Sequence, residues 1–574
     1  MSGGPIKQIF NAQIDKSYAS KELQIAGWVF KIRNLGGLVF IDLKDRTGIL
    51  QLVLDPKKIP EANKLNLQDC IMVNGFVRER PENQKNKDVP AGEIELDVRQ
   101  LTVLARSKTP PFVVEEELKA SEELRLKYRY LDLRRLSMQK IIIFRHYIVT
   151  AIREYLNTNG FIEIETPILT RSMPEGARDY LVPSRLYPGK FYALAQSPQM
   201  YKQLLMVAGF ERYYQIARCM RDEDPRHDRQ PEFTQLDLEM SFVNEEDIYQ
   251  LIEGMFKYIF KKVLNKELKI PFPRFTFEQV MNKYGTDKPD MSFGLEIIDL
   301  KQNFSKLQFP PFFDKEKISG IIVPNGKAIS RKLLDEYNED AKNAGLGGIY
   351  WVRKEANLSG SIAKYLNEEI TNQIGLKDGA LLITAAGDRK ILSFLGSLRN
   401  RIADELNLRG TNFHFLWVYD FPLFEIDEKT GRFSPCHHPF TQPKPEDLEY
   451  LDSDPLKVRG RQYDLVLNGN ELASGSIRNN NRQLQEKIFE ILGVDKETAG
   501  KKFGLLLEAL DYGAPPHGGI APGIERIVML LTGVKSIRDV IAFPKTTQAQ
   551  GLLENIPDVV EPEQLKELHL RIEE

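Results

Sequence analysis

Five short segments of alternating apolar and polar residues follow one another between Leu23 and Arg106, and this run limits the possible folds more than any other feature of the chain. Glycine-containing turns interrupt it at 35–37 and 46–48. Alternation with a period of two is typical of strands with one buried face. Five such strands in so short a stretch favour a small closed barrel, although a different barrel or a sandwich fits the same pattern.

The five-stranded oligonucleotide-binding (OB) barrel is the fold that we expect for residues 1–106. Pro110-Pro111 then breaks the chain before a charged helical stretch, which predicts a hinge over 107–135. Apolar residues at helical spacing between Ile141 and Tyr155 predict a long amphipathic helix that Gly160 ends, followed by a strand, FIEIETPIL.

The pattern of residues changes again after residue 289. Mixed strand and helix signals, many lysines and glycine loops without convergent catalytic residues predict an inserted α+β domain over 290–410. Strand-rich segments with dense polar motifs resume in 411–574, as though one α+β domain that began at 136–289 had been interrupted. A multidomain chain is also expected because 574 residues are too many for one hydrophobic core.

Bulk composition excludes several classes of protein. The net charge of −2 argues against indiscriminate nucleic-acid binding, so any RNA contact must be local. Cys70, Cys219 and Cys436 lie far apart without a CxxC pair, so neither a disulfide framework nor a zinc site is expected. The polar start and the lack of a long apolar run predict no membrane association and a cytoplasmic location.

Two segments, 213–221 and 232–240, predict antiparallel strands joined by a charged loop. The period of two places an aromatic and three polar or acidic side chains, Phe233, Gln235, Asp237 and Glu239, on one face. On the first strand the small Ala217 and Cys219 leave room for a ligand beside Arg221. A solvated sheet face with incidental ion pairs explains each residue singly but explains the whole set poorly.

The segment GAPPHGGIAPGIERIVMLLTG predicts a glycine-rich strand and turn that lead into a helix. Ile524, Ile527, Val528 and Leu531 form its buried stripe, so Arg526 projects from another face near the helix start. A guanidinium beside glycine-rich backbone suits a polyphosphate. Glycine-rich turns are common, and the interpretation gains weight only together with Arg221.

These residues carry a resemblance to class II aminoacyl-tRNA synthetases. Arg221-Asp-Glu223 with Phe233 resembles motif 2, Gly523-Ile-Glu-Arg526 resembles motif 3, and the helix with FIEIETP resembles motif 1. The segments YRYLDLRR, PEGARDYLVPSR, QSPQMYKQLLM, HHPFT, GSIR and SIRDVIAFPK are closer still to bacterial aspartyl-tRNA synthetases. The resemblance covers essentially the whole chain and implies a homodimer that joins L-aspartate to tRNA-Asp with ATP.

The resemblance implies roles for individual residues. It makes Arg221, Glu223 and Arg526 catalytic, with adenine between Phe233 and Arg526. ATP would be bound by Arg221, Asp222, Glu223, Gln230, Phe233, Glu471, Gly523, Ile524, Glu525 and Arg526. Asp464 and Glu471 would hold the Mg²⁺ that accompanies ATP. Because seven residues separate Glu471 from Arg478, the stretch 473–476 must bend or bulge if both side chains face the site.

The resemblance also implies an aspartate pocket in which cations meet the substrate's side-chain carboxylate. Its members would be Glu175, Ser197, Gln199, Lys202, Arg221, Gln235, Asp237, His437, His438 and Arg478. Lys202 and Arg478 are the candidate cations, with Gln235 and Asp237 for the ammonium. His437-His438 could be metal ligands, but no further ligand lies nearby at suitable spacing, and substrate contact is favoured.

Anticodon bases would be read by six residues of the barrel, Arg33, Phe40, Gln51, Arg80, Asn86 and Glu95. Without the resemblance, Phe40 fits a buried strand residue nearly as well. Three alternatives stay open: an asparaginyl-type enzyme, a non-catalytic RNA-binding relative, and an aspartyl enzyme that also charges tRNA-Asn. Leu35-Gly36 resembles the version that discriminates between the two tRNAs.

Overall fold

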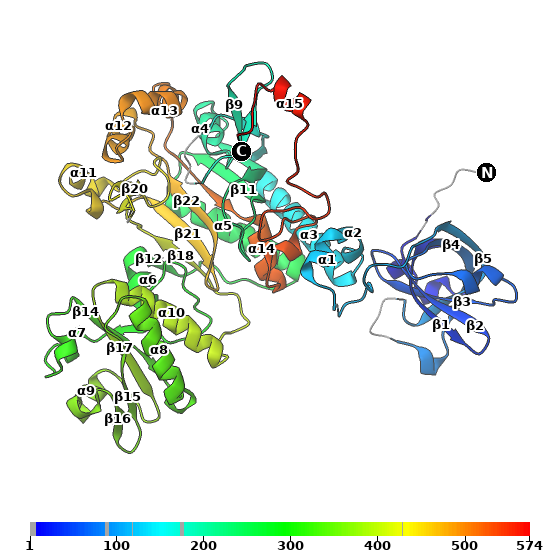
Figure 1. The fold of residues 1–574 in the computed structure, drawn as a ribbon, viewed down its shortest axis with the longest axis horizontal. Helices are drawn as coiled ribbons and strands as arrows, with labels where there is room; N and C mark the ends of the chain where they lie inside the picture. Colours follow the sequence, from blue (N-terminus) through cyan, green and yellow to red (C-terminus); the bar gives the residue numbers. More distant parts are fainter. Residues whose placement is uncertain are drawn as a thin grey trace. The chain divides into compact units, whose positions relative to one another are not determined.

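The computed structural model describes residues 7, 9–86, 91–117, 119–172, 177–427 and 429–573. The chain divides into two compact units. The first comprises residues 1–148, 223–231 and 528–574, and the second comprises 149–222 and 232–527. Most of the helices and strands named below are labelled in Figure 1.

A closed five-stranded barrel forms the N-terminal part of the first unit, as predicted. Its strands are β1 (Glu22–Leu35), β2 (Leu38–Lys44), β3 (Ile49–Leu54), β4 (Cys70–Glu79) and β5 (Ile94–Ala105), in the order β1-β2-β3-β5-β4. Alternate side chains such as Ile25, Ile41 and Leu52 fill the interior and are fully buried. Gly36 and Gly37 adopt left-handed φ values of 60° and 79° in the β1–β2 turn, which glycine permits without strain.

The predicted hinge folds into two short helices, α1 (Glu122–Lys127) and α2 (Arg129–Asp132). The buried Arg129 guanidinium donates to the carbonyls of Arg538, Ile541 and Ala542 at 2.9–3.0 Å. These residues lie in and after η11 (Ile537–Val540), upstream of α15 (Pro562–Glu567). The hinge is therefore fastened to the C-terminal extension.

An eight-stranded sheet is the centre of the second unit, in the order β12-β18-β21-β22-β23-β11-β10-β6. The two end strands pair in parallel and all the others antiparallel. Its strands are β6 (Ile162–Glu163), β10 (Arg212–Met220), β11 (Glu232–Ser241), β12 (Arg274–Thr276), β18 (Phe415–Tyr419), β21 (Gln462–Leu467), β22 (Asn470–Ile477) and β23 (His517–Pro522). Strands far apart in sequence thus become neighbours.

The helix predicted before Gly160 is α3 (Leu136–Thr158), and Gly160 follows its end with φ 77°. The strand predicted from FIEIETPIL is wrong in length, since only Ile162–Glu163 form β6 and Leu169 already belongs to a separate strand. Pro167 has no N–H with which to continue the ladder. A separate small sheet then forms from β7 (Leu169–Thr170), β8 (Leu181–Pro183) and β9 (Phe191–Leu194).

Helices and one further hairpin complete the large domain. They are α4 (Gln199–Val207), α5 (Glu245–Ile259), α6 (Phe277–Tyr284), α11 (Tyr450–Ser453), α12 (Arg482–Ile491), α13 (Lys496–Leu510) and α14 (Ile524–Thr532), with β19 (Phe424–Ile426) and β20 (Phe433–Pro435). The N-cap of α5 is Asn244, whose side chain accepts a hydrogen bond from the Glu246 N–H.

A second sheet of five strands, all antiparallel, lies between β12 and β18 in the sequence, within the stretch predicted as an insertion. It consists of β13 (Ile297–Asp299), β14 (Lys317–Val323), β15 (Tyr350–Lys354), β16 (Leu358–Gly360) and β17 (Leu381–Gly387). Leu381 and Ile383 pack with α8 (Arg331–Asn343) and α10 (Lys390–Glu405), while Leu382 belongs to a core on the other face. The insertion therefore has a hydrophobic core of its own on each face of the sheet. It also contains α7 (Lys301–Phe304) and α9 (Glu368–Gln373) (Figure 1).

Candidate functional site

The hairpin β10–β11 has the register that the sequence predicts. Cys219 is opposite Phe233 and Ala217 is opposite Gln235, so these four side chains share a face with Asp237 and Glu239. The small residues on β10 leave space over this face, and Arg221 follows directly after the strand. Its guanidinium lies 5.1 Å from the centre of the Phe233 ring.

Two cations and two carboxylates are buried together at the far end of this face. Lys202 Nζ lies 3.1 Å from Asp237 Oδ1 and 3.4 Å from Glu239 Oε2. Arg478 grips Glu239 with two parallel hydrogen bonds of 2.8 and 3.1 Å. All four side chains are at most 2% exposed. We call Lys202, Asp237, Glu239 and Arg478 the buried quartet.

Glu239 is the member of the quartet to which the sequence assigned no role. The period of two placed it on the correct face, but its contact with both cations depends on α4 and β22 meeting over β11. A Cβ added at Gly519 of β23 would collide with the Glu239 carboxylate and with the Leu238 carbonyl. Glycine at 519 thus makes room for the buried acid.

The two carboxyl groups of the quartet differ in acidity. Burial raises the pKa of Asp237 above its ordinary value, despite the nearby Lys202. Burial also opposes ionisation of Glu239, but Arg478 and Lys202 outweigh it and hold the pKa of that carboxyl below its ordinary value. Glu239 is therefore the fixed counter-charge, and Asp237 is the carboxyl that most needs a further cationic partner.

His437 shows that three predicted cations share one site. Burial and the positive charges of Arg478, Lys202 and Arg221 lower the pKa of His437 to about 3. Its Nδ1 is buried and has no hydrogen-bond partner among the residues that the structure describes. His438 Nε2 lies 2.6 Å from Arg478 Nη1, and burial also lowers the pKa of His438. Both imidazoles are neutral at pH 7.

The helix start predicted for nucleotide binding adjoins the same strand. Gly523 forms a bridge to Gln235, and the Glu525 carboxylate accepts a 2.9 Å hydrogen bond from the Thr234 N–H. Ile524 is fully buried, whereas Arg526 is partly exposed and donates to the Glu471 carbonyl at 2.5 Å. The placement of adenine between Phe233 and Arg526 stays a prediction.

Strand β22 contains the irregularity that the spacing of Glu471 and Arg478 demands. Leu465 pairs with Ala473 and Val466 with Glu471, so Leu472 is the extra residue of a bulge. The bulge lies one residue before the predicted stretch 473–476.

Asp464 and Glu471 lie together beside this bulge. Burial and the negative charge of Glu471 raise the pKa of Asp464 well above its ordinary value. Ser474 Oγ donates to Asp464 Oδ1 at 2.6 Å and lies 3.2 Å from His437 Nε2. The acidic pair is thereby connected to the quartet's surroundings, and Ser474 is a contact that the sequence did not suggest.

The remaining predicted residues are placed as follows. Asp222 N–H donates to the Arg178 carbonyl at 3.0 Å, and Ser197 Oγ accepts from Gln199 N–H at 3.3 Å. In the first unit, Glu223 pairs with Arg229 at 3.1 Å, and Gln230 Oε1 accepts from the Lys545 N–H at 2.8 Å. Glu175 lies outside the described residues.

The outer face of the barrel brings several of the predicted anticodon residues together. Arg33 is the cross-strand partner of Phe40, and Gln51 is the partner of Glu95. Arg33 donates to Gln51 at 3.1 Å, and Gln51 donates to Glu95 at 2.7 Å. Phe40 is half-buried although its neighbours point into the core, which is contrary to a buried strand residue.

The other two predicted anticodon residues lie at the edge of this group. Burial lowers the pKa of Arg80, although the negative charges of Glu95 and Asp42 oppose this shift. The Arg80 Nε donates to the Ile94 carbonyl at 2.8 Å. Asn86 is exposed. Asp42 and Arg78, which the sequence did not single out, pair with Arg33 at 2.6 Å and with Glu95 at 2.8 Å.

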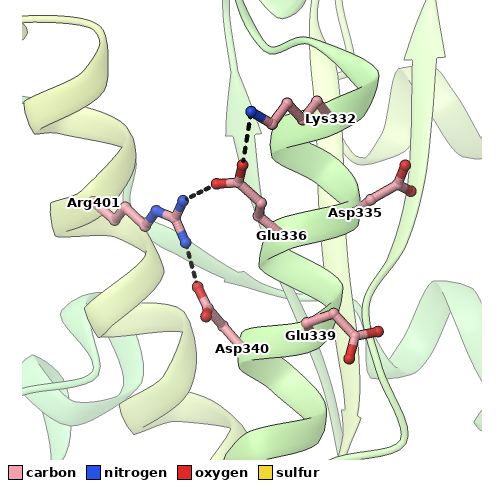
Figure 2. A pocket seen from close by; sticks show the side chains of 6 residues that line it. All are labelled: Lys332, Asp335, Glu336, Glu339, Asp340 and Arg401. Atoms are coloured by element: carbon pink, nitrogen blue, oxygen red, sulfur yellow. Dashed lines mark hydrogen bonds and ion pairs between the residues drawn. The ribbon is translucent and has the colours of Figure 1, made fainter.

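A shallow hollow lies on the insertion, between side chains of two helices (Figure 2). It is lined by Lys332, Asp335, Glu336, Glu339, Asp340 and Arg401 of α8 and α10. Arg401 holds Glu336 and Asp340, Arg331 holds Asp335, and Lys342 holds Glu339. Each carboxylate of the hollow therefore has a basic partner that compensates its negative charge.

Two further observations concern metals and membranes. Within the described ranges, no group of three or more His, Cys, Asp or Glu side chains could hold a metal ion. None of the helices in the part of the chain that the structure describes has the length and apolar character needed to cross a bilayer.

Comparison with known families agrees with this geometry. The family of class II tRNA synthetases (D, K and N) matches residues 121–547, and an OB-fold nucleic acid binding domain matches residues 23–104. The chain belongs to the class II tRNA synthetases of the D, K and N group. The predicted fold class, an OB barrel followed by a class II catalytic domain, is confirmed.

Curated relatives match this chain over nearly its whole length. An aspartate--tRNA(Asp/Asn) ligase of Caldanaerobacter subterraneus subsp. tengcongensis is 50% identical over 568 residues, covering 96% of each chain. An aspartate--tRNA ligase of Clostridium perfringens is 48% identical over 569 residues, covering 96% of this chain and 95% of the relative.

Solved structures share the fold at low sequence identity. Asparaginyl-tRNA synthetase from Pyrococcus horikoshii, complexed with asparaginyl-adenylate, is 20% identical, with a TM-score of 0.61 over 94% of this chain and 99% of that one. Aspartyl tRNA synthetase from Entamoeba histolytica is 19% identical, with a TM-score of 0.58 over 95% of this chain and 93% of that one.

Proposed function

We propose that the chain is an aspartate–tRNA ligase, which activates L-aspartate with ATP and transfers it to the 3′ end of tRNA-Asp. The observation that carries this proposal is the buried quartet beside His437 and Arg221. The names of the full-length relatives support the same substrate.

The charges of the quartet favour an acidic amino acid that also carries an ammonium group. The substrate ammonium would pair with Asp237 and release Lys202 for the side-chain carboxylate, to which Arg478 also contributes. Asparagine has no charge to satisfy two cations, and a lysine side chain would be repelled. Gln199, Gln235, Ser197 and His438 complete the pocket, and Glu175 is proposed for the same substrate.

Positioning and charge neutralisation suffice for the chemistry. The aspartate α-carboxylate is already ionised at neutral pH and attacks the α-phosphorus of ATP, and pyrophosphate leaves. Arg221 neutralises charge near the α-phosphate, and Arg526 binds the γ-phosphate. Asp222, Glu223, Gln230, Phe233 and the segment 523–525 hold the rest of the nucleotide. The tRNA hydroxyl then attacks the carbonyl carbon of the adenylate, and AMP leaves.

Asp464 and Glu471 would hold Mg²⁺. These two neighbouring carboxyl groups, of which Asp464 has a pKa raised by burial and by the charge of Glu471, form an oxygen donor pair that suits this hard cation. When bound, Mg²⁺ supplies positive charge that neutralises the triphosphate.

We propose that the outer face of the barrel, with Arg33, Phe40, Gln51, Arg80, Asn86 and Glu95, reads the anticodon. The proposed domains are 1–106, a hinge at 107–135, a catalytic domain in 136–289 and 411–574, and an insertion at 290–410. The exposed apolar side chains of Ile162, Leu181 and Phe191, which are 47–57% exposed, support a homodimer interface near motif 1. A cytoplasmic location stays a prediction.

Exchange of labelled pyrophosphate into ATP, measured with each amino acid in turn, tests the proposed function. We expect exchange that depends on L-aspartate. Exchange that depends on asparagine would identify the asparaginyl-type alternative, and no exchange with any amino acid would identify a non-catalytic RNA-binding relative.

A second activity, charging of tRNA-Asn with aspartate, is favoured by the names of several relatives, which are called aspartate--tRNA(Asp/Asn) ligases. Others are called aspartate--tRNA ligases, without the Asp/Asn designation. Leu35-Gly36 in the β1–β2 turn is the feature predicted to discriminate. Charging of purified tRNA-Asp and tRNA-Asn decides between the two specificities.

A further inference from the structure

Lys288 reaches the candidate nucleotide site from the loop that leads into the insertion. Its Nζ lies 2.8 Å from Glu471 Oε2, and its side chain is 42% exposed. Arg526 donates to the backbone carbonyl of the same residue at 2.5 Å. Two cations from distant parts of the sequence therefore converge on Glu471, one on its carboxylate and one on its backbone.

The loop that carries Lys288 is held firmly. Two residues further on, the Asp290 carboxylate accepts a 2.7 Å hydrogen bond from Arg409, and the Asp290 carbonyl accepts one of 2.7 Å from the buried Arg399 of α10. A Cβ added at Gly469, in the β21–β22 turn, would lie 3.3 Å from Asp290. The insertion and the turn before Glu471 thus fix the backbone from which the lysine projects.

The Lys288 side chain itself remains free to change partners. A lysine ammonium is a compact charge on a flexible stem, and it binds phosphate oxygens as a point charge. Its pair with Glu471 is partly exposed, and such pairs contribute little, so a phosphate group can replace the carboxylate as partner. Arg526, proposed for the γ-phosphate, lies against the same residue.

We propose that Lys288 is a phosphate-binding residue of the nucleotide site and contacts the terminal phosphates of ATP and the pyrophosphate product. This inference rests on the proposed function, because it needs a nucleotide at Arg526. It also assigns a role to the insertion, which is to hold, through α10 and Arg409, the loop from which Lys288 extends.

Equilibrium binding of ATP and of AMP to the full-length Lys288→Met variant tests the proposal, together with the KM values for ATP, pyrophosphate and aspartate in exchange. We expect at least tenfold weaker ATP binding and a tenfold higher KM for pyrophosphate. AMP, which lacks the terminal phosphates, should bind as to the wild type, and the KM for aspartate should not change. Lys288→Arg should restore most of the ATP affinity.

Lys283→Met is the matched control, because Lys283 lies on α6 and pairs with Glu296 at 3.5 Å on the surface. It should leave ATP binding unchanged. Equal weakening of ATP and AMP in Lys288→Met, or unchanged binding of both, would overturn the inference. Wild-type protein that binds ATP without aspartate-dependent exchange would instead contradict the proposed function.

Discussion

The catalytic sheet and the barrel both carry a line of arginine–carboxylate contacts on one strand face, but they place it in different surroundings. In the sheet, Arg478 and Glu239 are at most 2% exposed. In the barrel, Gln51 and Glu95 are buried, but the arginines remain accessible: the Arg33 side chain is 38% exposed beside Asp42 at 18%, and the Arg78 side chain is 47% exposed. Buried charges are costly to leave unpaired, whereas partly exposed ones exchange partners easily. The first arrangement suits a small charged substrate, and the second suits an RNA surface.

Arg478→Leu should have the largest effect on function. It removes a buried cation and leaves Glu239 with Lys202 alone, so we expect aspartate affinity to fall by about 3–5 kcal/mol. ATP affinity should largely survive. Calorimetric titration with each ligand measures both, and Arg482→Leu, on the surface of α12, is the control. Wild-type aspartate affinity in Arg478→Leu would refute the pocket.

Glu239→Gln should cause the largest loss of stability. The shape is kept but Lys202 and Arg478 lose their shared charge, so we expect the free energy of unfolding to fall by about 3 kcal/mol. Each of the three tryptophans, Trp28, Trp351 and Trp417, lies in a different domain. Urea unfolding followed by Trp417 fluorescence, with the other two changed to Phe, isolates the catalytic sheet.

The exposed pair of Glu246 and Arg274 provides the control for this measurement, as Glu246→Gln should change the unfolding free energy by less than about 1 kcal/mol. Equal losses in Glu239→Gln and Glu246→Gln would remove the distinction between the two surroundings.

Gln51→Ala tests the barrel side of the comparison. It removes a side chain that links Arg33 to Glu95. We expect kcat/KM for tRNA charging to fall by a factor that corresponds to about 1–3 kcal/mol of lost transition-state stabilisation. Aspartate-dependent pyrophosphate exchange should stay at the wild-type rate. Gln100→Ala, elsewhere on β5, should leave both rates unchanged. A loss of exchange in Gln51→Ala would show an effect beyond anticodon reading.

The lowered pKa of His437 predicts a pH dependence of stability. Between pH 6.5 and about 3 the unfolded chain binds a proton at this residue that the folded chain does not. The free energy of unfolding therefore falls as the pH drops below 6.5, by up to about 1.4 kcal/mol per pH unit. His437→Gln should show a smaller loss between pH 7 and 5.5, by about 1 kcal/mol, in the Trp417 unfolding measurement. An unchanged loss would mean that His437 titrates normally.

Asp42→Asn should have the smallest effect. The Arg33–Asp42 pair is partly exposed, so its loss should cost less than about 1 kcal/mol in the unfolding of the barrel, followed by Trp28 fluorescence. A cost as large as that of Glu239→Gln would show that exposure does not separate the two networks.

Local periodicity was enough to predict the elements of the site. The shared face of Phe233, Gln235 and Asp237 follows from the spacing of residues along one segment, as does the projection of Arg526 from its helix. The bulge before Arg478 was expected only because the resemblance gives Glu471 and Arg478 roles in one site, and it lies at Leu472, outside the predicted stretch 473–476. The closed barrel was predictable for the same reason. The strand after Gly160 is shorter than predicted, because Pro167 has no N–H with which to extend the ladder and a separate strand begins at Leu169.

Contacts that depend on sheet order were not predictable in this way. Glu239 contacts Arg478 because only one strand, β23, lies between β22 and β11 in the sheet. Lys288 contacts Glu471 because the loop that leads into the inserted domain lies against the β21–β22 turn. No pattern within a single segment specifies such meetings. The resemblance to known synthetases supplied Lys202 and Arg478 as partners, whereas composition and spacing did not.

The close approach of Gly519 to Glu239 means that the residue at 239 restricts which residue can stand at 519. An added Cβ at 519 would meet the Glu239 carboxylate and also the Leu238 carbonyl, which no change at 239 removes. In related sequences glycine should therefore stay at 519 wherever Glu239 is present. One missing methyl group on β23 thus restricts which amino acid the pocket can evolve to accept.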